Sequence, residues 1–160
     1  MASIVKGKPE GFHSVTPYII VPNAVKALKL YAQAFGAKEI SRMAGPSAES
    51  TMHAEMRIGD SIVMLTDENP QWNAKSPATL GGTPVSLHVY VEDADATFQK
   101  ATAAGFAVQM PPTDMFWGDR YAKVVDPFGH IWGIATRKEM VSPEEMARRH
   151  AEMLKQMGGT

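Results

Sequence analysis

The segment SVTPYIIVPNAVKALKLYAQAFG (residues 14–36) returns about 70 positions later as VSLHVYVEDADATFQKATAAG (residues 85–105). In each copy an apolar alternation leads to a helix-capping residue, Asn23 or Asp93, and then to apolar residues at helical spacing. A glycine, Gly36 or Gly105, ends each copy. Because a repeat constrains the architecture more strongly than any single motif, the sequence predicts two similar modules that face a shared pocket.

Three short strand patterns follow each predicted helix. They cover residues 37–43, 51–58 and 61–66 in the first copy, and residues 106–110, 121–126 and 131–136 in the second. Each copy is therefore predicted to be a βαβββ module, the first at about residues 13–66 and the second at about 85–136. The predicted fold class is α+β, with the two modules forming a shared curved mixed sheet around a pocket.

The remaining segments are predicted to be a linker and a helix. Residues 67–84 carry three prolines and a glycine pair, which is typical of a loop. A helix is predicted at about residues 142–157, because Ser142 can cap it, Pro143 suits its first position and Glu145 completes a capping box. The methionines of this helix favour packing against the body or a second subunit.

Composition excludes several classes of partner and site. The 160 residues, 44% of them hydrophobic, suffice for one compact domain over residues 1–160. The 16 basic and 17 acidic residues are balanced, so we expect no binding to nucleic acid or membranes. The absence of cysteine excludes disulfides and thiolate metal sites. Residues 1–11 lack the apolar core of a signal peptide, and a cytoplasmic protein is expected.

Polar side chains recur on one face of the predicted strands. Successive side chains of a strand point to opposite faces, so the aliphatic positions suit helices and the others suit a ligand or water. The resulting candidate surface comprises Thr16, Tyr18, His53, Glu55, Ser86, His88, Tyr90, Tyr121 and Lys123. The pattern alone supports a binding pocket and a solvated sheet face about equally.

A loop rich in aromatic residues precedes one of these strands. Phe116, Trp117 and Arg120 flank a glycine there, and they suit a lid on which a planar ligand stacks. The alternative is that one ring fills an edge of the core. His88 and Glu55 are the candidate catalytic residues, because imidazole suits proton transfer near neutral pH. His88 could equally line the pocket through hydrogen bonds, and Glu55 could pair with Lys123 or meet a charged ligand.

Three stretches resemble the vicinal oxygen chelate superfamily of glyoxalase I, bleomycin-resistance proteins and extradiol dioxygenases. They are HSVTPYIIVPNAVKALKLYAQAFGA, SLHVYVEDADATFQKATAAG and FWGDRYAKVVDPFGHIWGIAT. The similarity looks closest to the PhnB-like subgroup. It implies the paired βαβββ fold and a homodimer, but it leaves the activity open, because this fold hosts many activities.

The resemblance also implies where a metal would be bound. Metal-using members place ligands on the first and last strands of each module, at positions that correspond here to Thr16, Ser86, Gly133 and either Val63 or Met64. Hydroxyl, glycine and aliphatic or thioether groups cannot replace imidazole and carboxylate ligands. We therefore expect no metal or other cofactor. The alternative is a displaced divalent metal site that uses His88 and Glu55.

These observations lead to one principal hypothesis and two alternatives. The principal hypothesis is a metal-free small-molecule binding protein, similar to the antibiotic-sequestering bleomycin-resistance proteins. The first alternative is a lyase, isomerase or dioxygenase that uses a displaced metal or acid–base catalysis. The second alternative is a module whose partner is another protein, bound through the C-terminal helix.

Overall fold

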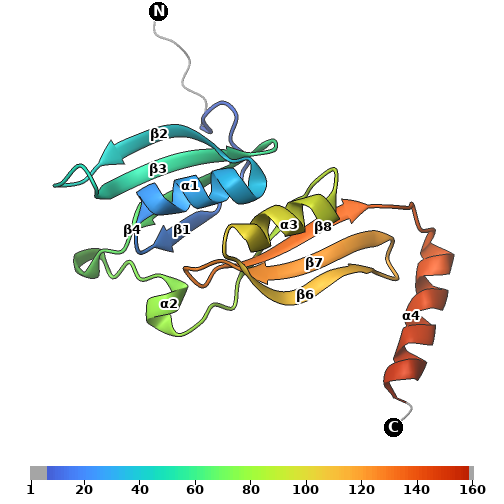
Figure 1. Ribbon diagram of the computed structural model, residues 1–160. Helices are drawn as coiled ribbons and strands as arrows, with labels where there is room; N and C mark the ends of the chain where they lie inside the picture. Colours follow the sequence, from blue (N-terminus) through green and yellow to red (C-terminus); the bar gives the residue numbers. More distant parts are fainter. Residues whose placement is uncertain (1–6, 159–160) are drawn as a thin grey trace, which may run out of the picture. The chain divides into compact units, whose positions relative to one another are not determined.

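The computed structural model describes residues 7–158 and contains the expected strands and helices (Figure 1). Module one contains β1 (Tyr18–Val21), α1 (Ala24–Phe35), β2 (Lys38–Ala44), β3 (Thr51–Ile58) and β4 (Ser61–Asp67). Module two contains β5 (Ser86–Tyr90), α3 (Ala94–Ala103), β6 (Ala107–Asp114), β7 (Asp119–Val125) and β8 (Ile131–Arg137). The short helices η1 (Pro70–Trp72) and α2 (Pro77–Leu80) lie between the modules in sequence, and α4 (Pro143–Met157) follows them. The α+β class, the two βαβββ modules and the C-terminal helix are confirmed.

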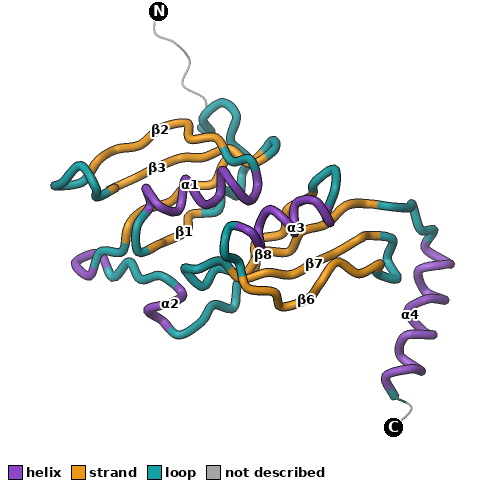
Figure 2. The backbone as a smooth tube through the Cα atoms, viewed as in Figure 1, coloured by secondary structure: helices purple, strands orange, loops and turns teal. Residues whose placement is uncertain are grey.

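The strands form two four-stranded sheets with the same topology. The strand order is β1-β4-β3-β2 in sheet one and β5-β8-β7-β6 in sheet two. The first strand of each module pairs in parallel with the last, and the other neighbours are antiparallel. Figure 2 draws the strands of both sheets in orange. The structure divides into two compact units, one of residues 7–84 with Phe128–His130 and the other of residues 85–127 with 131–158.

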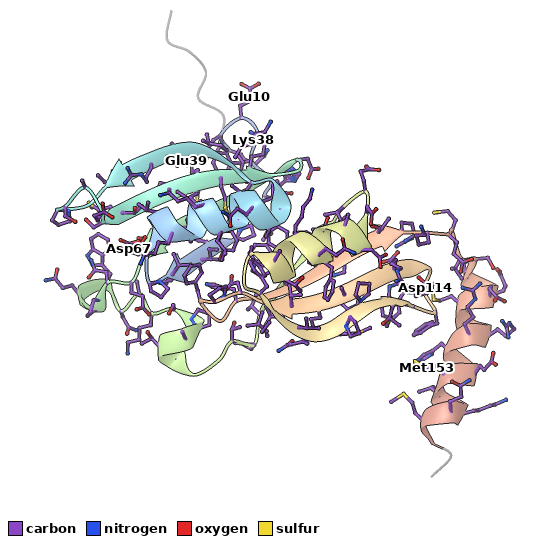
Figure 3. The ribbon with its side chains drawn as sticks, in the orientation of Figure 1. Glu10, Lys38, Glu39, Asp67, Asp114 and Met153 are labelled. Carbon is purple, nitrogen blue, oxygen red and sulfur yellow. The ribbon has the colours of Figure 1, made fainter. Side chains whose placement is uncertain are left out.

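Helix α1 is fixed at both ends by local hydrogen bonds. Asn23 caps its start by accepting from the Lys26 N–H, and Gly36 ends it in the left-handed conformation at φ 67°. Asp67, at the end of β4, accepts from the Ala24 N–H at 2.6 Å and from the Thr51 N–H at 2.8 Å. Figure 3 places Asp67 beside the start of α1. This carboxylate therefore joins the helix to two strands.

Each module's long helix packs on one face of its own sheet. Helix α1 contacts β2, β3 and β4, and α3 contacts β6, β7 and β8 (Figure 1). The helix-facing positions are buried and apolar, and include Ile19, Val21, Ala54, Met56 and Leu65 in unit one and Ala122, Val124, Trp132 and Ile134 in unit two. The aliphatic strand positions predicted from sequence to face a helix are therefore the ones that form the cores.

Three elements differ from the sequence prediction. The predicted loop at residues 67–84 contains η1 and α2, each of which begins with a proline that suits the first turn of a helix. Strand β6 extends past the prediction through Pro111 and Pro112, which is allowed because β6 is an edge strand of its sheet. Strand β7 begins at Asp119, inside the segment that was expected to form a lid.

Helix α4 has the predicted start and little contact with the rest of its unit. The Ser142 hydroxyl accepts from the Glu145 N–H, and Pro143 is the first helical residue. None of its residues is buried, and Arg148 pairs with both Glu145 and Glu152 on its surface. No helix within residues 7–158 has the length and apolar character needed to cross a membrane.

Replacement of Asp67 by alanine should destabilise unit one. The substitution leaves the Ala24 and Thr51 N–H groups without their carboxylate acceptor, which should cost about 1–3 kcal/mol of unfolding free energy. Urea unfolding of Asp67→Ala measures this cost. The matched control is Asp60→Ala in the exposed β3–β4 turn, and equal losses in the two variants would contradict the assigned role of Asp67.

Candidate functional site

In unit one, three candidate residues form a hydrogen-bonded chain on the sheet face opposite α1. The Tyr18 hydroxyl lies 3.1 Å from His53 Nδ1, and His53 Nε2 lies 3.3 Å from Glu55 Oε1. The Tyr18 and His53 rings also meet edge to face, with centroids 5.5 Å apart. The sequence predicted these residues on one face, with Glu55 either paired with Lys123 or meeting a charged ligand, and it did not predict the bond between Glu55 and His53.

Strand register explains why this chain forms. Tyr18 and Glu55 are both backbone partners of Met64 on the central strand β4, so they lie in one row across the sheet. His53 precedes Glu55 by two residues and therefore points to the same face. The side chains of His53 and Glu55 are 30% and 21% exposed, which leaves the chain accessible but partly shielded from water.

In unit two, the candidate residues form an aromatic cluster on the face opposite α3. The rings of His88 and Tyr121 stack with centroids 5.5 Å apart and an interplanar angle of 8°. Tyr90 contacts His88 at 4.9 Å, and Trp117 contacts Tyr121 at 6.3 Å. His88 and Tyr90 come from β5, and Tyr121 comes from β7 on the other side of β8. Trp117 comes from the turn that precedes β7.

The cluster depends on the absence of a side chain at Gly133. This residue lies between His88 of β5 and Lys123 of β7 in the sheet register. A Cβ atom at Gly133 would lie 2.8 Å from Tyr121 Cε2 and 3.0 Å from His88 Nδ1. The two rings therefore occupy the space into which a side chain at this position would project.

A buried carboxylate supports one edge of the cluster and was not among the sequence candidates. Asp119 is 2% exposed and pairs with the Arg137 guanidinium. It also accepts from Trp117 Nε1 at 3.2 Å, and the Tyr90 hydroxyl lies 3.5 Å away. This bonding holds Trp117 and Tyr90 beside the sheet and raises the pKa of Arg137. Burial raises the pKa of the Tyr121 hydroxyl, so Tyr121 is a neutral donor near neutral pH.

Two residues of the predicted lid lie outside this cluster. Arg120 points to the α3 side of sheet two, where it binds both carboxylate oxygens of Asp95 at 2.8 Å and contacts Asp114. Phe116 packs against Trp117 and stacks on His150 of α4, with centroids 5.8 Å apart. Successive side chains of a strand point to opposite faces, so Arg120 points away from the face on which Asp119 and Tyr121 lie.

The side chains do not fit the metal centre that the resemblance implies. Gly133 has no ligand atom and its open side is filled by rings, and its counterpart by register in unit one is Met64. Ser86 and Thr16 contribute only hydroxyl groups, which are poor replacements for imidazole or carboxylate. Within residues 7–158, no group of three or more histidine, aspartate or glutamate side chains has a geometry suited to a metal ion.

Comparison with known proteins identifies the family. The model of the glyoxalase/bleomycin resistance protein/dioxygenase superfamily matches residues 11–134. The chain belongs to this superfamily. Among curated relatives, the uncharacterized protein Mb0911c of Mycobacterium bovis is 40% identical over 136 residues, covering 83% of this chain and 89% of the relative.

Solved structures of low sequence identity share the superfamily fold. A Bacillus cereus PhnB protein, titled a putative 3-demethylubiquinone-9 3-methyltransferase, superposes with a TM-score of 0.60 at 19% identity, covering 78% of this chain and 99% of that one. The fosfomycin resistance protein FosX of Mesorhizobium loti has a TM-score of 0.57 at 16% identity, covering 78% and 91%. These similarities support the fold predicted from sequence.

A Gly133→Ala substitution should disturb the His88–Tyr121 stack. The new Cβ overlaps both rings, so we expect a loss of about 1–3 kcal/mol of unfolding free energy, typical of overpacking. In a Tyr121→Ala background the same substitution should cost clearly less, because the nearest ring atoms are gone. A double-mutant cycle measured by urea unfolding checks this. Additive losses would show that Gly133 and Tyr121 are not coupled.

Proposed function

We propose that the protein binds a planar small molecule on the aromatic face of sheet two without the metal centre of its metal-using relatives. The observation that carries this proposal is the stacked pair of His88 and Tyr121 over Gly133. At this position the side chains offer ring faces and hydrogen-bonding groups, and Gly133 itself offers no ligand atom to a metal. Stacking on aromatic rings favours flat and conjugated ligands.

The charges on this face favour a ligand with an anionic group. Lys123 belongs to the same strand face as Tyr121, and within residues 7–158 it has no ion-pair partner. Arg137 is already neutralised by the buried Asp119, so Lys123 supplies the remaining positive charge. An aromatic carboxylate or phenolate would therefore stack on the rings and place its charge near this ammonium group.

Antibiotic sequestration is the finer form of this proposal. The superfamily includes bleomycin resistance proteins, and one protein of the same fold is a fosfomycin resistance protein. The antibiotic class is supported by family membership alone, whereas the aromatic and anionic character is supported by the geometry of His88, Tyr121 and Lys123.

A matched pair of probes tests the ligand chemistry. Calorimetric titration with 2-naphthoate should show saturable binding, and the neutral 2-naphthamide should bind about tenfold more weakly, corresponding to roughly 1.4 kcal/mol from one charge contact. Lys123→Met should remove this difference, while Lys29→Met on α1 should leave it unchanged. Tyr121→Ala should weaken both ligands. Absence of saturable binding at millimolar naphthoate would overturn the proposal for this ligand class.

Metal analysis separates this proposal from the metal-enzyme alternative. Protein purified without a metal column, then incubated with nickel, zinc, manganese or ferrous iron and desalted, should retain less than stoichiometric metal. Glu55 is bonded to His53, so a site that uses Glu55 would have to break that bond. Near-stoichiometric metal that is lost in His88→Ala would instead establish the displaced site and favour lyase or dioxygenase chemistry.

A further inference from the structure

The Tyr18–His53–Glu55 chain has a direction that follows from the chemistry of its members. An ionised carboxylate can only accept, so the hydrogen between His53 Nε2 and Glu55 Oε1 belongs to the imidazole. A neutral imidazole with its proton on Nε2 has a lone pair on Nδ1. The Tyr18 hydroxyl therefore donates to Nδ1, and all three groups are oriented as a relay from phenol to carboxylate.

The order of the groups, a phenol followed by an imidazole and a carboxylate, is that of a reactive group whose base is oriented by a third group. The first member, Tyr18, is 53% exposed, whereas the carboxylate at the other end is the least exposed of the three. The oxygen of Tyr18 retains lone pairs on the accessible side, because its proton is directed to His53. A proton that arrives at this oxygen can be matched by the departure of the phenolic proton to Nδ1.

The aromatic face of unit two lacks such a chain. There the imidazole of His88 stacks flat on Tyr121, and the nearby carboxylate of Asp119 is paired with Arg137. In unit one, by contrast, the imidazole of His53 is bonded directly to a carboxylate on one side and to a phenol on the other. The two faces are therefore suited to different tasks, stacking in unit two and proton transfer in unit one.

We propose that Tyr18, His53 and Glu55 form an acid–base site that removes a proton from a carbon acid, a compound whose carbanion is stabilised by conjugation. The substrate C–H bond breaks and its electron pair stays on the substrate. The proton moves to the Tyr18 oxygen while the phenolic proton moves to His53 Nδ1. The resulting imidazolium is stabilised by the Glu55 carboxylate. Return of the proton at another atom of the substrate completes an isomerisation without any change in oxidation state.

A synthetic carbon acid tests this site directly. In 5-nitrobenzisoxazole, removal of the ring C–H proton breaks the N–O bond and releases a coloured cyanonitrophenolate. The wild-type protein should accelerate this reaction with saturation kinetics. Tyr18→Phe and His53→Ala should each lower kcat/KM by roughly 10²-fold, the lower end of the range for general acid–base catalysis. Glu55→Gln keeps an acceptor but removes the charge, and it should lower kcat by about tenfold with little change in KM.

The control variants remove the same kinds of functional group at positions outside the Tyr18–His53–Glu55 hydrogen-bonded chain. Glu10→Gln and His13→Ala alter an exposed carboxylate and an exposed imidazole, and they should retain the wild-type rate. Circular dichroism and urea unfolding establish that each variant is folded. Wild-type activity no greater than that of free imidazole at equal concentration would overturn the proposal. A Tyr18→Phe variant that is as active as the wild type, or more active, would overturn the role of Tyr18.

The tautomer of His53 gives a readout that needs no substrate. Nitrogen NMR at mildly alkaline pH should show the proton of His53 on Nε2, and Glu55→Gln and Tyr18→Phe should shift the ring signals of His53 while leaving those of His13 unchanged. A proton on Nδ1 would contradict the relay.

The test is independent of the proposed binding function. The relay lies in unit one, whereas the naphthoate titration probes Lys123 and Tyr121 in unit two. Failure of the titration with a positive elimination assay would remove the aromatic-binding proposal alone. The opposite pair of results would remove the acid–base site alone.

Discussion

The packing of one helix against one face of a four-stranded sheet is the constraint on which each unit depends. Helix α1 and helix α3 contribute small buried residues, among them Ala24, Ala27 and Ala101, to a close contact with the strands. The burial of alternate strand positions provides the apolar surface that stabilises the unit. It also fixes the strand register, since a slip of one residue would turn the whole apolar set away from the helix.

Register, in turn, determines which side chains meet on the opposite face. Three residues from adjacent strands form a row across each sheet, and the middle one comes from the last strand of the module. It is Met64 in unit one and Gly133 in unit two. In unit one Met64 lies between Tyr18 and Glu55, and its thioether offers no hydrogen to the phenol. The Tyr18 hydroxyl bonds instead with His53, which lies two residues before Glu55 on β3. A glycine between His88 and Lys123 lets two rings close over it. One backbone pattern therefore produces a hydrogen-bonded chain in one unit and an aromatic stack in the other.

Much of the architecture could be predicted because its signals are local. Each signal lies within a few consecutive residues, as do the caps at Asn23 and Asp93 and the apolar alternation of β1, β3 and β5.

The candidate site was predicted less completely because its bonds join residues that are distant in sequence. Tyr18 meets His53 across 35 residues, and only the register of β1, β4 and β3 brings them together. Asp119 was missed because a buried acid beside a turn looks like an ordinary loop residue until Arg137 is found next to it. Arg120 was assigned to the lid because the start of β7 was placed two residues too late, which obscured its alternation with Asp119 and Tyr121.

In each sheet the side covered by the helix is constrained more strongly than the open side. This inequality explains why the open faces of the two units differ in chemistry. A substitution on the helix side must match the volume of a close-packed core, and a single misplaced methylene group there costs free energy. A substitution on the open side meets fewer neighbours, as the intermediate exposure of His53, Glu55 and Lys123 shows. The repeated module can therefore keep its core while its open face changes chemistry. The exception is a position such as Gly133, where the new contacts between rings have become close-packed themselves. A side chain at Gly133 would require His88 and Tyr121 to move, so packing constrains this position as it constrains a position in the core.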